Sequence, residues 1–310
     1  MKLFKPQDGL TQLLAQICRH LPPWMLWPLS RVVGILAYVF ERGQRRRVEK
    51  NFRVLMRATG GTKSPAVLTR EYFRRQLMEV VVGYVLQNAP ERSWDRLVER
   101  HGFERIGELL KQGRGLVLCC VHFGTHVVTA NLLAHEGYCP VIIRPASMRD
   151  ITSQVLRELL LIHHETIYVG SRGSGLATPL RAAIQAIRQG KVLGIAIDGD
   201  IGDDPVYLPF LGGKIPVHRG AIALAHRACA PVGFGVAAIE RGRVVVTYGP
   251  FMEPGPDGYT EEQMDHFLRA CVARYEQAVR DHPESVWWSR PLCEALGLAD
   301  TSADRRDAYL

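Results

Sequence analysis

Two histidines lie four residues apart, just after an apolar run of the sequence. His122 and His126 follow residues 115–121, a short continuous apolar stretch that predicts a buried strand. Functional groups in parallel α/β sheets collect at the carboxyl ends of strands, which is where His122 stands. Its imidazole can accept a proton from a hydroxyl near neutral pH, as acyl transfer to an alcohol requires.

Two carboxylates follow a second apolar run. Asp198 and Asp200 come after residues 191–197, which predict another buried strand whose end could face the same cleft. Residues 125–135 predict a helix that begins directly behind His122, and the amides of Gly124 and Thr125 would lie at its start. We expect those amides, with His126 next in the chain as an oxyanion-binding or structural residue, to stabilise a developing oxyanion.

The same histidines permit a different chemistry. Two histidines at i and i+4 have the spacing of metal ligands on a helix, and Asp198 or Asp200 could complete a metallohydrolase site. However, no Glu follows the first His, and no third His is placed convincingly. We therefore expect no metal and no organic cofactor.

The surrounding chain alternates in the way that a parallel sheet requires. From about residue 100, apolar runs of strand length alternate with longer helical patterns, which predicts an α/β fold with a central, mostly parallel sheet flanked by helices. The predicted strands are 115–121, 140–144, 166–169, 191–197, 231–239 and 243–248, the last two forming a hairpin. The predicted helices are 125–135, 151–163, 179–189, 220–229 and 260–281.

The N-terminal region has the character of a membrane-associating helix. Residues 24–40 are apolar and carry tryptophans at the front, and the basic segment ERGQRRR follows directly. An aromatic-flanked apolar helix beside a basic cluster suits the surface of an anionic bilayer, although a buried helix followed by a solvated basic one would look similar. No nucleic-acid-binding module is recognisable, so we expect no nucleic-acid partner.

Composition sets wider limits. The 310 residues carry 39 Lys+Arg and 31 Asp+Glu, a net charge of +8, and 47% are hydrophobic, as in a folded globular protein. No uncharged apolar run of 18 residues occurs, which argues against a conventional spanning helix. The 7 cysteines form no C-x-x-C pair, and no cleavable signal peptide is evident, so a reducing compartment is expected.

The motifs resemble those of a known family, the bacterial late acyltransferases of lipid A biosynthesis (lauroyl/myristoyl acyltransferases). His122-Phe123-Gly124 looks like the start of the family's His-Phe-Gly-Asn-Trp-Glu signature, which is similar to the His-x4-Glu/Asp pattern of glycerolipid acyltransferases. Further similar segments follow in the right order between residues 15 and 292: RRRVEKNFR (45–53), RP (144–145), GIAIDGD (194–200), YLPFLGGK (207–214), residues 220–231 and WWSR (287–290).

The resemblance implies a glycerolipid-acyltransferase-like fold and an acyl-transfer activity. The donor would be an acyl-carrier protein thioester, or acyl-CoA, and the acceptor a hydroxyl or amine of a lipid or glycolipid, with His122 as general base. The expected place is the cytoplasmic face of the bacterial inner membrane, as a peripheral or monotopic protein. Residues 1–60 would form the membrane-associating part, 61–295 the acyltransferase domain and 296–310 a polar tail.

The sequence departs from the family at one decisive position. Val127 stands where the family has the carboxylate that orients the histidine, and Val cannot replace it. Three interpretations stay open. Asp198 or Asp200 supplies the missing acid, His126 reshapes the site by sharing a helical face with His122, or the protein is impaired and binds acyl carrier or lipid without transfer.

Several basic residues are candidates for contact with an acidic carrier or an anionic headgroup. They are Arg144, Arg149, Arg172, Lys214 and Arg219. Arg144 is the strongest of them because it stands at a predicted strand end and matches the family's Arg. Phe210 and Leu211 could line an acyl channel, although core packing explains them equally well.

Overall fold

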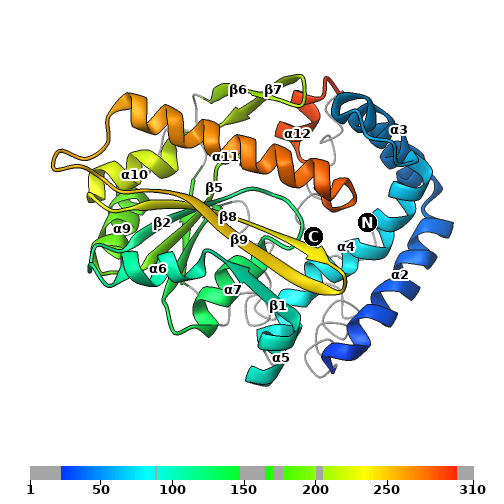
Figure 1. The fold of residues 1–310 in the computed structure, drawn as a ribbon, viewed down its shortest axis with the longest axis horizontal. Coiled ribbons are helices and arrows are strands. Elements are labelled where there is room, and N and C mark those ends of the chain that lie inside the picture. The colour runs from blue at the N-terminus through cyan, green and yellow to red at the C-terminus, as the bar shows by residue number, and fades with distance from the viewer. Residues whose placement is uncertain (1–21, 88, 147–164, 171–176, 200–204, 299–310) are drawn as a thin grey trace.

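The fold is that of a computed structural model, which describes residues 22–87, 89–146, 165–170, 177–199 and 205–298 (Figure 1). The helical elements are η1 (Pro23–Met25), α2 (Leu26–Phe40), α3 (Arg42–Thr59), α4 (Pro65–Gln87), α5 (Glu91–Leu97), α6 (Phe103–Leu110), α7 (Val127–His135), α9 (Ala177–Arg188), α10 (Gly220–Ala228), α11 (Glu261–Asp281), η3 (Pro283–Ser285) and α12 (Arg290–Ala295). The strands are β1 (Val98–His101), β2 (Leu116–Cys120), β3 (Pro140–Pro145), β4 (Glu165–Val169), β5 (Val192–Ala196), β6 (Val206–Phe210), β7 (Gly213–Val217), β8 (Val232–Glu240) and β9 (Arg243–Met252).

A seven-stranded sheet forms the centre, in the order β1-β9-β8-β2-β5-β3-β4. All neighbouring strands pair in parallel except β8 and β9, which form an antiparallel hairpin. The predicted α/β class with a mostly parallel sheet is therefore confirmed. The predicted strands and helices agree with these elements within a few residues, apart from the helix expected at 151–163, which lies outside the described residues.

Helices cover both faces of the sheet, and the side chains of β2 show why. Val117 and Cys119 belong to the core that packs under α9, α10 and α11, whereas Leu116 and Leu118 belong to the core under α5, α6 and α7. Successive residues of a strand point to opposite faces, so a strand covered on both sides must be apolar throughout. This explains the continuous apolar run that precedes His122.

One feature of the fold, a small second sheet, does not follow from the apolar runs of the sequence. Residues 207–214, which resemble a segment of the family's sequences, lie in a separate antiparallel hairpin formed by β6 and β7. It lies beside α11 and α12, and Gly213 is so close to α12 that an added Cβ would meet the Ala295 carbonyl oxygen at 2.0 Å.

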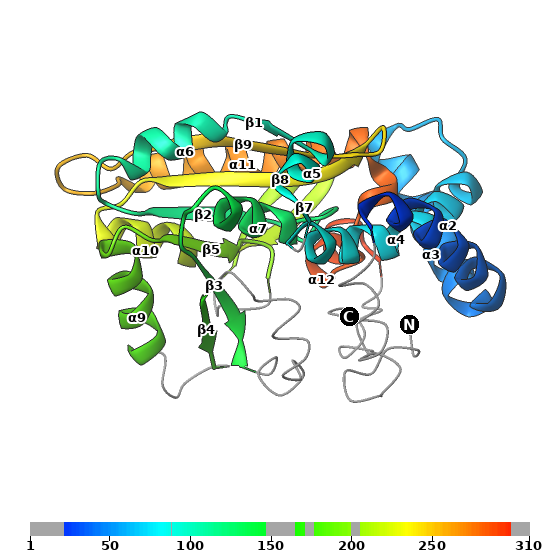
Figure 2. The ribbon, with the colours of Figure 1, turned by 90° about the horizontal axis from the view of Figure 1, so that it is seen from below.

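The N-terminal helices pack on α4 at one end of the sheet (Figures 1 and 2). Gly34 of α2 allows a close crossing, because an added Cβ would lie 2.4 Å from the Phe73 carbonyl oxygen. The Ser30 hydroxyl also donates a 2.8 Å hydrogen bond to the Arg74 carbonyl oxygen. Among the described helices, none combines the length and the apolar character needed to cross a membrane.

Candidate active site

His122 and Asp198 meet at the carboxyl edge of the sheet. β2 pairs with β5 in register up to Cys120 and Ala196, and the Ile197 amide then donates a 2.9 Å hydrogen bond to the Cys120 carbonyl oxygen. This bond holds the two chain segments together beyond the strands. The backbone amide of His122 reaches both carboxylate oxygens of Asp198, at 3.0 and 3.1 Å, and the ring Nδ1 lies 2.9 Å from Asp198 Oδ1.

This contact sets the protonation pattern of the imidazole. Asp198 is only 1% exposed, and a buried carboxylate requires donors to compensate its charge. The amide and the ring Nδ1–H of His122 are such donors. With its proton on Nδ1, the neutral ring carries its basic lone pair on Nε2, which is the arrangement of a histidine general base oriented by a carboxylate.

The structure therefore brings together two of the residues that the sequence predicted. Asp198 contacts the His122 ring, as expected if Asp198 or Asp200 supplies the acid that Val127 cannot. Asp200 lies outside the described residues. Val127 begins α7 and faces α4 instead: a Cβ added to Gly83 would lie 3.6 Å from Val127 Cγ1. Side chains at position 127 are thus directed toward α4.

A sharp turn follows His122 and depends on a glycine. Gly124 has φ +50°, and a Cβ on it would lie 2.2 Å from the Ala237 carbonyl oxygen of β8. The segment before α12 holds this turn, because Phe123 and Val286 form an isolated β-bridge and Trp287 Nε1 donates a 2.9 Å hydrogen bond to the Gly124 carbonyl oxygen. The WWSR segment (287–290) resembles a family element, but nothing in the sequence indicates that Trp287 contacts the turn after His122.

The expected oxyanion site at this turn needs correction. The Gly124 amide donates to the Ser285 carbonyl oxygen at 2.9 Å, and the Thr125 amide donates to the Ala237 carbonyl oxygen at 3.2 Å. Both amides are used to hold the turn against its neighbours. An oxyanion could bind them only by displacing these carbonyl groups, so we no longer assign it to Gly124 and Thr125.

His126 stands beside His122, although not on a shared helix face. α7 begins only at Val127, so the turn brings the two imidazole rings together, with their centroids 5.3 Å apart at 64°. The His126 ring also packs edge-on against Trp287, with the ring centroids 4.9 Å apart. Burial lowers the pKa of His126 to about 3, and the nearby His122 and Arg144 act in the same direction against the opposing charge of Asp198.

The structure separates the proposed binding residues. Arg144 lies near the end of β3, on the same sheet edge as His122, and its charge acts on His126. Arg219 donates a 3.0 Å hydrogen bond to Glu261, so its charge is partly compensated, and Lys214 is exposed on β7. Arg149 and Arg172 lie outside the described residues.

Phe210 is not placed to line a channel. Its side chain is 1% exposed and packs in the core against Tyr275, with ring centroids 5.0 Å apart. Tyr275 in turn packs against Phe123 at 6.0 Å. Phe210 therefore supports the residue next to His122 from behind, and the earlier expectation of substrate contact is corrected.

The described residues contain no cluster of side chains that would support the metal-site interpretation. Within the described ranges, no three His, Cys, Asp or Glu side chains come close enough together to hold a metal ion. What this sheet edge does present is a histidine with an orienting carboxylate, beside a second, neutral imidazole. Such a site can remove a proton from a hydroxyl or amine that attacks an acyl group.

A histidine paired with a carboxylate at a sheet edge is compatible with acyl transfer, and the comparison with known families gives the class of protein. The sequence profile described as bacterial lipid A biosynthesis acyltransferase matches residues 6–292. The chain therefore belongs to the bacterial lipid A biosynthesis acyltransferases. The resemblance stated from the motifs is thus confirmed.

Two further comparisons concern curated proteins and solved structures. No curated protein matches the chain. Among solved structures, the crystal structure of the 1-acyl-sn-glycerophosphate (LPA) acyltransferase PlsC from Thermotoga maritima is similar, at 15% sequence identity and a TM-score of 0.36. The match covers 86% of this chain and 98% of the Thermotoga chain.

Proposed function

We propose that the protein moves a fatty acyl chain from a carrier thioester to a hydroxyl or amine of a lipid or glycolipid acceptor, with His122 as the base. The observation that carries the proposal is the 2.9 Å contact between His122 Nδ1 and Asp198 Oδ1. It gives His122 an orienting acid even though Val127 occupies the position of the family's usual one. Membership of the acyltransferase family supports the reaction type.

The reaction conserves protons and needs no co-reactant. His122 Nε2 takes the proton of the acceptor O–H or N–H, and the freed electron pair attacks the thioester carbonyl carbon. The carbonyl oxygen becomes negative in the tetrahedral intermediate. The C–S bond then breaks, and the leaving thiolate takes the proton from the His122 imidazolium. The products are the acylated acceptor and the free carrier thiol.

Asp198 serves both halves of this cycle. Its carboxylate holds the ring in the tautomer with the lone pair on Nε2 while the base is neutral. It then stabilises the imidazolium that exists between the two proton transfers. Because the same carboxylate also binds the His122 backbone amide, ring and main chain are positioned together.

The helices α2 and α3 support a place at an anionic membrane surface. α2 packs on α4 with one side and exposes a continuous apolar stripe on the other, consisting of Val32, Ile35, Leu36, Val39 and Phe40. Phe40 is 77% exposed, and Trp24 just before the helix is 69% exposed. A helix with such a face gains free energy by burying it at a lipid interface.

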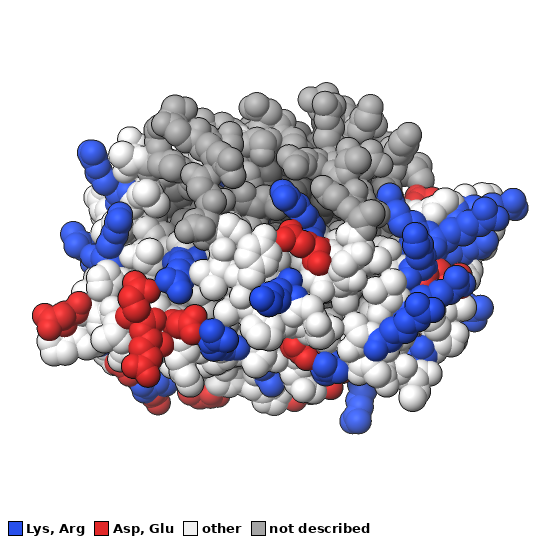
Figure 3. Space-filling view, turned by 90° about the horizontal axis from the view of Figure 1, so that it is seen from above, with Lys and Arg blue, Asp and Glu red and all other residues white. Residues whose placement is uncertain are grey.

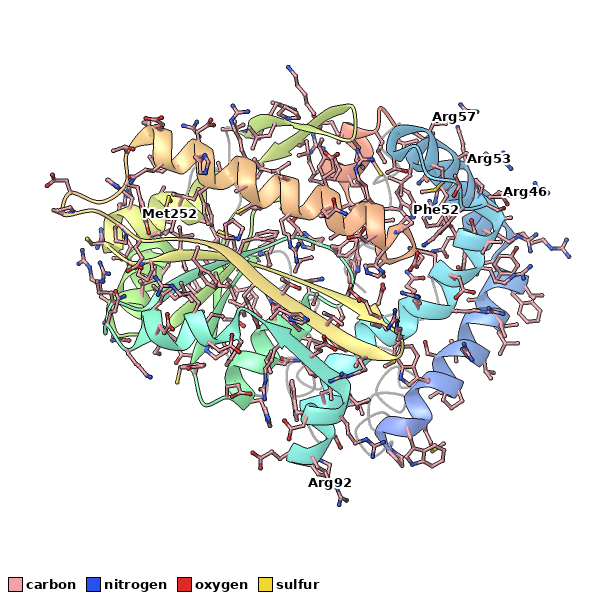
Figure 4. The ribbon with its side chains drawn as sticks, viewed as in Figure 1. Arg46, Phe52, Arg53, Arg57, Arg92 and Met252 are labelled. Atoms are coloured by element: carbon pink, nitrogen blue, oxygen red, sulfur yellow. The ribbon has the colours of Figure 1, made fainter. Side chains whose placement is uncertain are left out.

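α3 adds a matching electrostatic surface. Arg46, Arg53 and Arg57 project outward from the helix, whereas Phe52 of the same helix points inward (Figure 4). Figure 3 shows Lys and Arg side chains gathered at this end of the molecule. Each such cation is worth about 1 kcal/mol near an anionic leaflet. We therefore infer that η1, α2 and α3 hold the protein on the cytoplasmic leaflet, where a lipid acceptor is available to the site.

The test is a transfer assay with purified wild type and His122→Ala in detergent. Each is given lauroyl-loaded acyl-carrier protein and a total bacterial lipid extract, and both thioester loss and newly acylated lipid are followed. We expect transfer by the wild type alone. No thioester loss by the wild type, with binding of the loaded carrier retained, would contradict the proposal and favour a binding protein that does not transfer.

A further inference from the structure

The proposed reaction places a negative charge on the thioester oxygen, and the turn after His122 does not supply the usual donors. The amides of four successive residues, 122 to 125, all donate within the protein: His122 to Asp198, Phe123 to the Val121 carbonyl oxygen, Gly124 to Ser285 and Thr125 to Ala237. Removal of a single oxyanion donor typically costs about 10²–10³ in kcat. A donor from another group near His122 would therefore be of catalytic value.

His126 is the polar side chain that the turn places beside the base. Its ring lies edge-on to that of His122, with centroids 5.3 Å apart, and it also packs edge-on against Trp287 at 4.9 Å. Nδ1 is buried and has no hydrogen-bond partner among the described groups. The ring is therefore held by packing against aromatic neighbours, and its hydrogen-bonding capacity is not consumed by a described protein group.

The surroundings also decide which nitrogen carries the proton. Buried N–H groups without an acceptor are rarer in proteins than buried acceptors without a donor. The buried Nδ1 therefore keeps the lone pair, and the proton lies on Nε2. The lowered pKa agrees with a ring that stays neutral at physiological pH. A neutral imidazole has one N–H to donate, and at this position it is Nε2–H.

We propose that His126 donates a hydrogen bond from Nε2 to the carbonyl oxygen of the bound thioester, and that this bond strengthens as the oxygen becomes negative, so that two neighbouring histidines divide the chemistry. This inference rests on the proposed acyl transfer. His122, paired with Asp198, moves the proton, and His126 keeps its own proton throughout. Two titratable groups with opposite surroundings are typical of sites where acid–base and electrostatic tasks are separated.

The proposal also explains a departure from the family motif. In the His-Phe-Gly-Asn-Trp-Glu signature that the sequence resembles, the position of His126 holds Trp, and that of Thr125 holds Asn. An imidazole keeps an N–H and a flat ring for packing on Trp287, within a smaller volume than indole. The polar function at this position would survive the change from Trp to His, whereas an apolar replacement would remove it.

The first test compares two variants of His126, one that keeps the ring packing and one that keeps a hydrogen-bond donor. His126→Phe keeps a flat ring against Trp287 but has no N–H, and His126→Gln has an N–H donor but no ring. In the transfer assay with lauroyl-loaded carrier, we expect His126→Phe to lower kcat by about 10²–10³ with an unchanged KM for the carrier. His126→Gln should retain more activity than His126→Phe.

The results separate the inference from the function on which it rests. If the wild type transfers and His126→Phe is equally fast, or if Gln and Phe lose activity equally, the inference is wrong and the proposed function stands. If the wild type consumes no thioester, both are overturned. Thermal unfolding of each variant shows whether a loss of rate is a loss of fold.

A second test does not require turnover. A lauroyl thioester with a ¹³C carbonyl is bound to His122→Ala and to the His122→Ala/His126→Phe double variant, and the carbonyl stretch is measured by infrared difference spectroscopy. A hydrogen bond from His126 would lower the stretching frequency in the first protein relative to the second. Equal frequencies in the two proteins would overturn the inference.

Discussion

The carboxyl edge of the sheet and the outer face of α2 and α3 depart from the usual distribution of side chains in opposite directions. At the sheet edge a carboxylate, Asp198, is buried, and the imidazole of His126 is held neutral inside the protein. On α2 and α3, large apolar groups such as Phe40 are exposed beside a row of cations. Proteins ordinarily bury apolar groups and expose charged ones. Departures of this kind concentrate at functional sites.

The two regions also differ in how tightly they are specified. Asp198 is fixed by three contacts to a single residue, and a change of one atom there alters the tautomer of His122. In the proposed membrane contact, the α2–α3 face would act through the sum of many similar side chains, so that any one could be lost at small cost. We therefore expect single substitutions to have large effects at the first region and only combined substitutions to matter at the second.

The largest effect is expected from Asp198→Asn. The amide can occupy the same space, but its NH₂ group cannot accept the Nδ1 proton and favours the wrong tautomer of His122. Loss of an orienting acid in this way typically lowers kcat by about 10⁴. The measurement is the initial rate of thioester loss under saturating carrier, and a rate within tenfold of wild type would remove Asp198 from the mechanism.

The second region requires a combined change. Arg46, Arg53 and Arg57 are replaced together by Gln, and binding to vesicles containing phosphatidylglycerol is measured by co-sedimentation. Arg53 pairs with Glu49 at 2.6 Å and should contribute the least of the three. At about 1 kcal/mol for each cation, we expect a weakening of at most roughly 100-fold at low salt. The turnover of detergent-dispersed substrate should not change.

The matched control for this charge change is a triple replacement elsewhere. Arg92, Arg181 and Arg227 are exposed cations on α5, α9 and α10, and their replacement by Gln changes the net charge equally. Arg92 lies far from α3 in the fold (Figure 4). If both triple variants lose vesicle binding to the same extent, net charge and not the α3 surface is responsible.

α4 lies between the two regions, and its buried Glu79 gives a smaller, pH-dependent effect. Burial raises the pKa of Glu79 to about 7, while the Ser285 hydroxyl and Arg75 oppose the shift and Glu284 adds to it. The unfolded carboxyl ionises near its ordinary value, so stability falls as pH rises from about 4.5 to 7 and stays lower above that.

Glu79→Gln removes this loss. The difference in unfolding free energy between the variant and the wild type should increase, in favour of the variant, by about 2–3 kcal/mol from pH 5 to pH 8. Denaturant titrations of both proteins at the two pH values would measure this. Parallel stability curves for the two proteins would mean that Glu79 does not titrate in this range.

The smallest effect is expected from Val127→Glu, which restores the carboxylate of the family motif. Because position 127 faces Gly83 of α4 and His122 Nδ1 already faces Asp198, the new carboxylate has no route to the imidazole. Placed in the Asp198→Asn protein, it should leave kcat as low as before. A recovery of transfer would show that the motif position and Asp198 are interchangeable.

Much of the fold could be predicted because the sheet is covered on both sides. The runs before His122 and Asp198 are continuously apolar for that reason, and parallel pairing brings their ends to one edge. What could not be predicted was the pairing itself, because Asp198 and Asp200 both follow the same apolar run in the sequence. The hydrogen bond from Ile197 to Cys120 is what places Asp198 beside His122.

The errors have a common physical origin in long-range contacts. The amides of Gly124 and Thr125 stand where helix-start amides are ordinarily free, but Ser285 and Ala237, more than a hundred residues away, accept from them. Phe210 stands beside glycines as an exposed loop residue would, yet the β6–β7 hairpin turns it into the core. No local pattern around either site contains this information.

The central claim is that His122 and Asp198 act as one catalytic unit, and a double-mutant cycle tests it most directly. Initial rates of lauroyl transfer are measured for wild type, His122→Ala, Asp198→Asn and the double variant under identical conditions. Residues that act as a unit are strongly non-additive, so we predict that the double variant is no slower than His122→Ala alone. If the double variant instead loses the product of the two single effects, the two residues act independently and the account is contradicted.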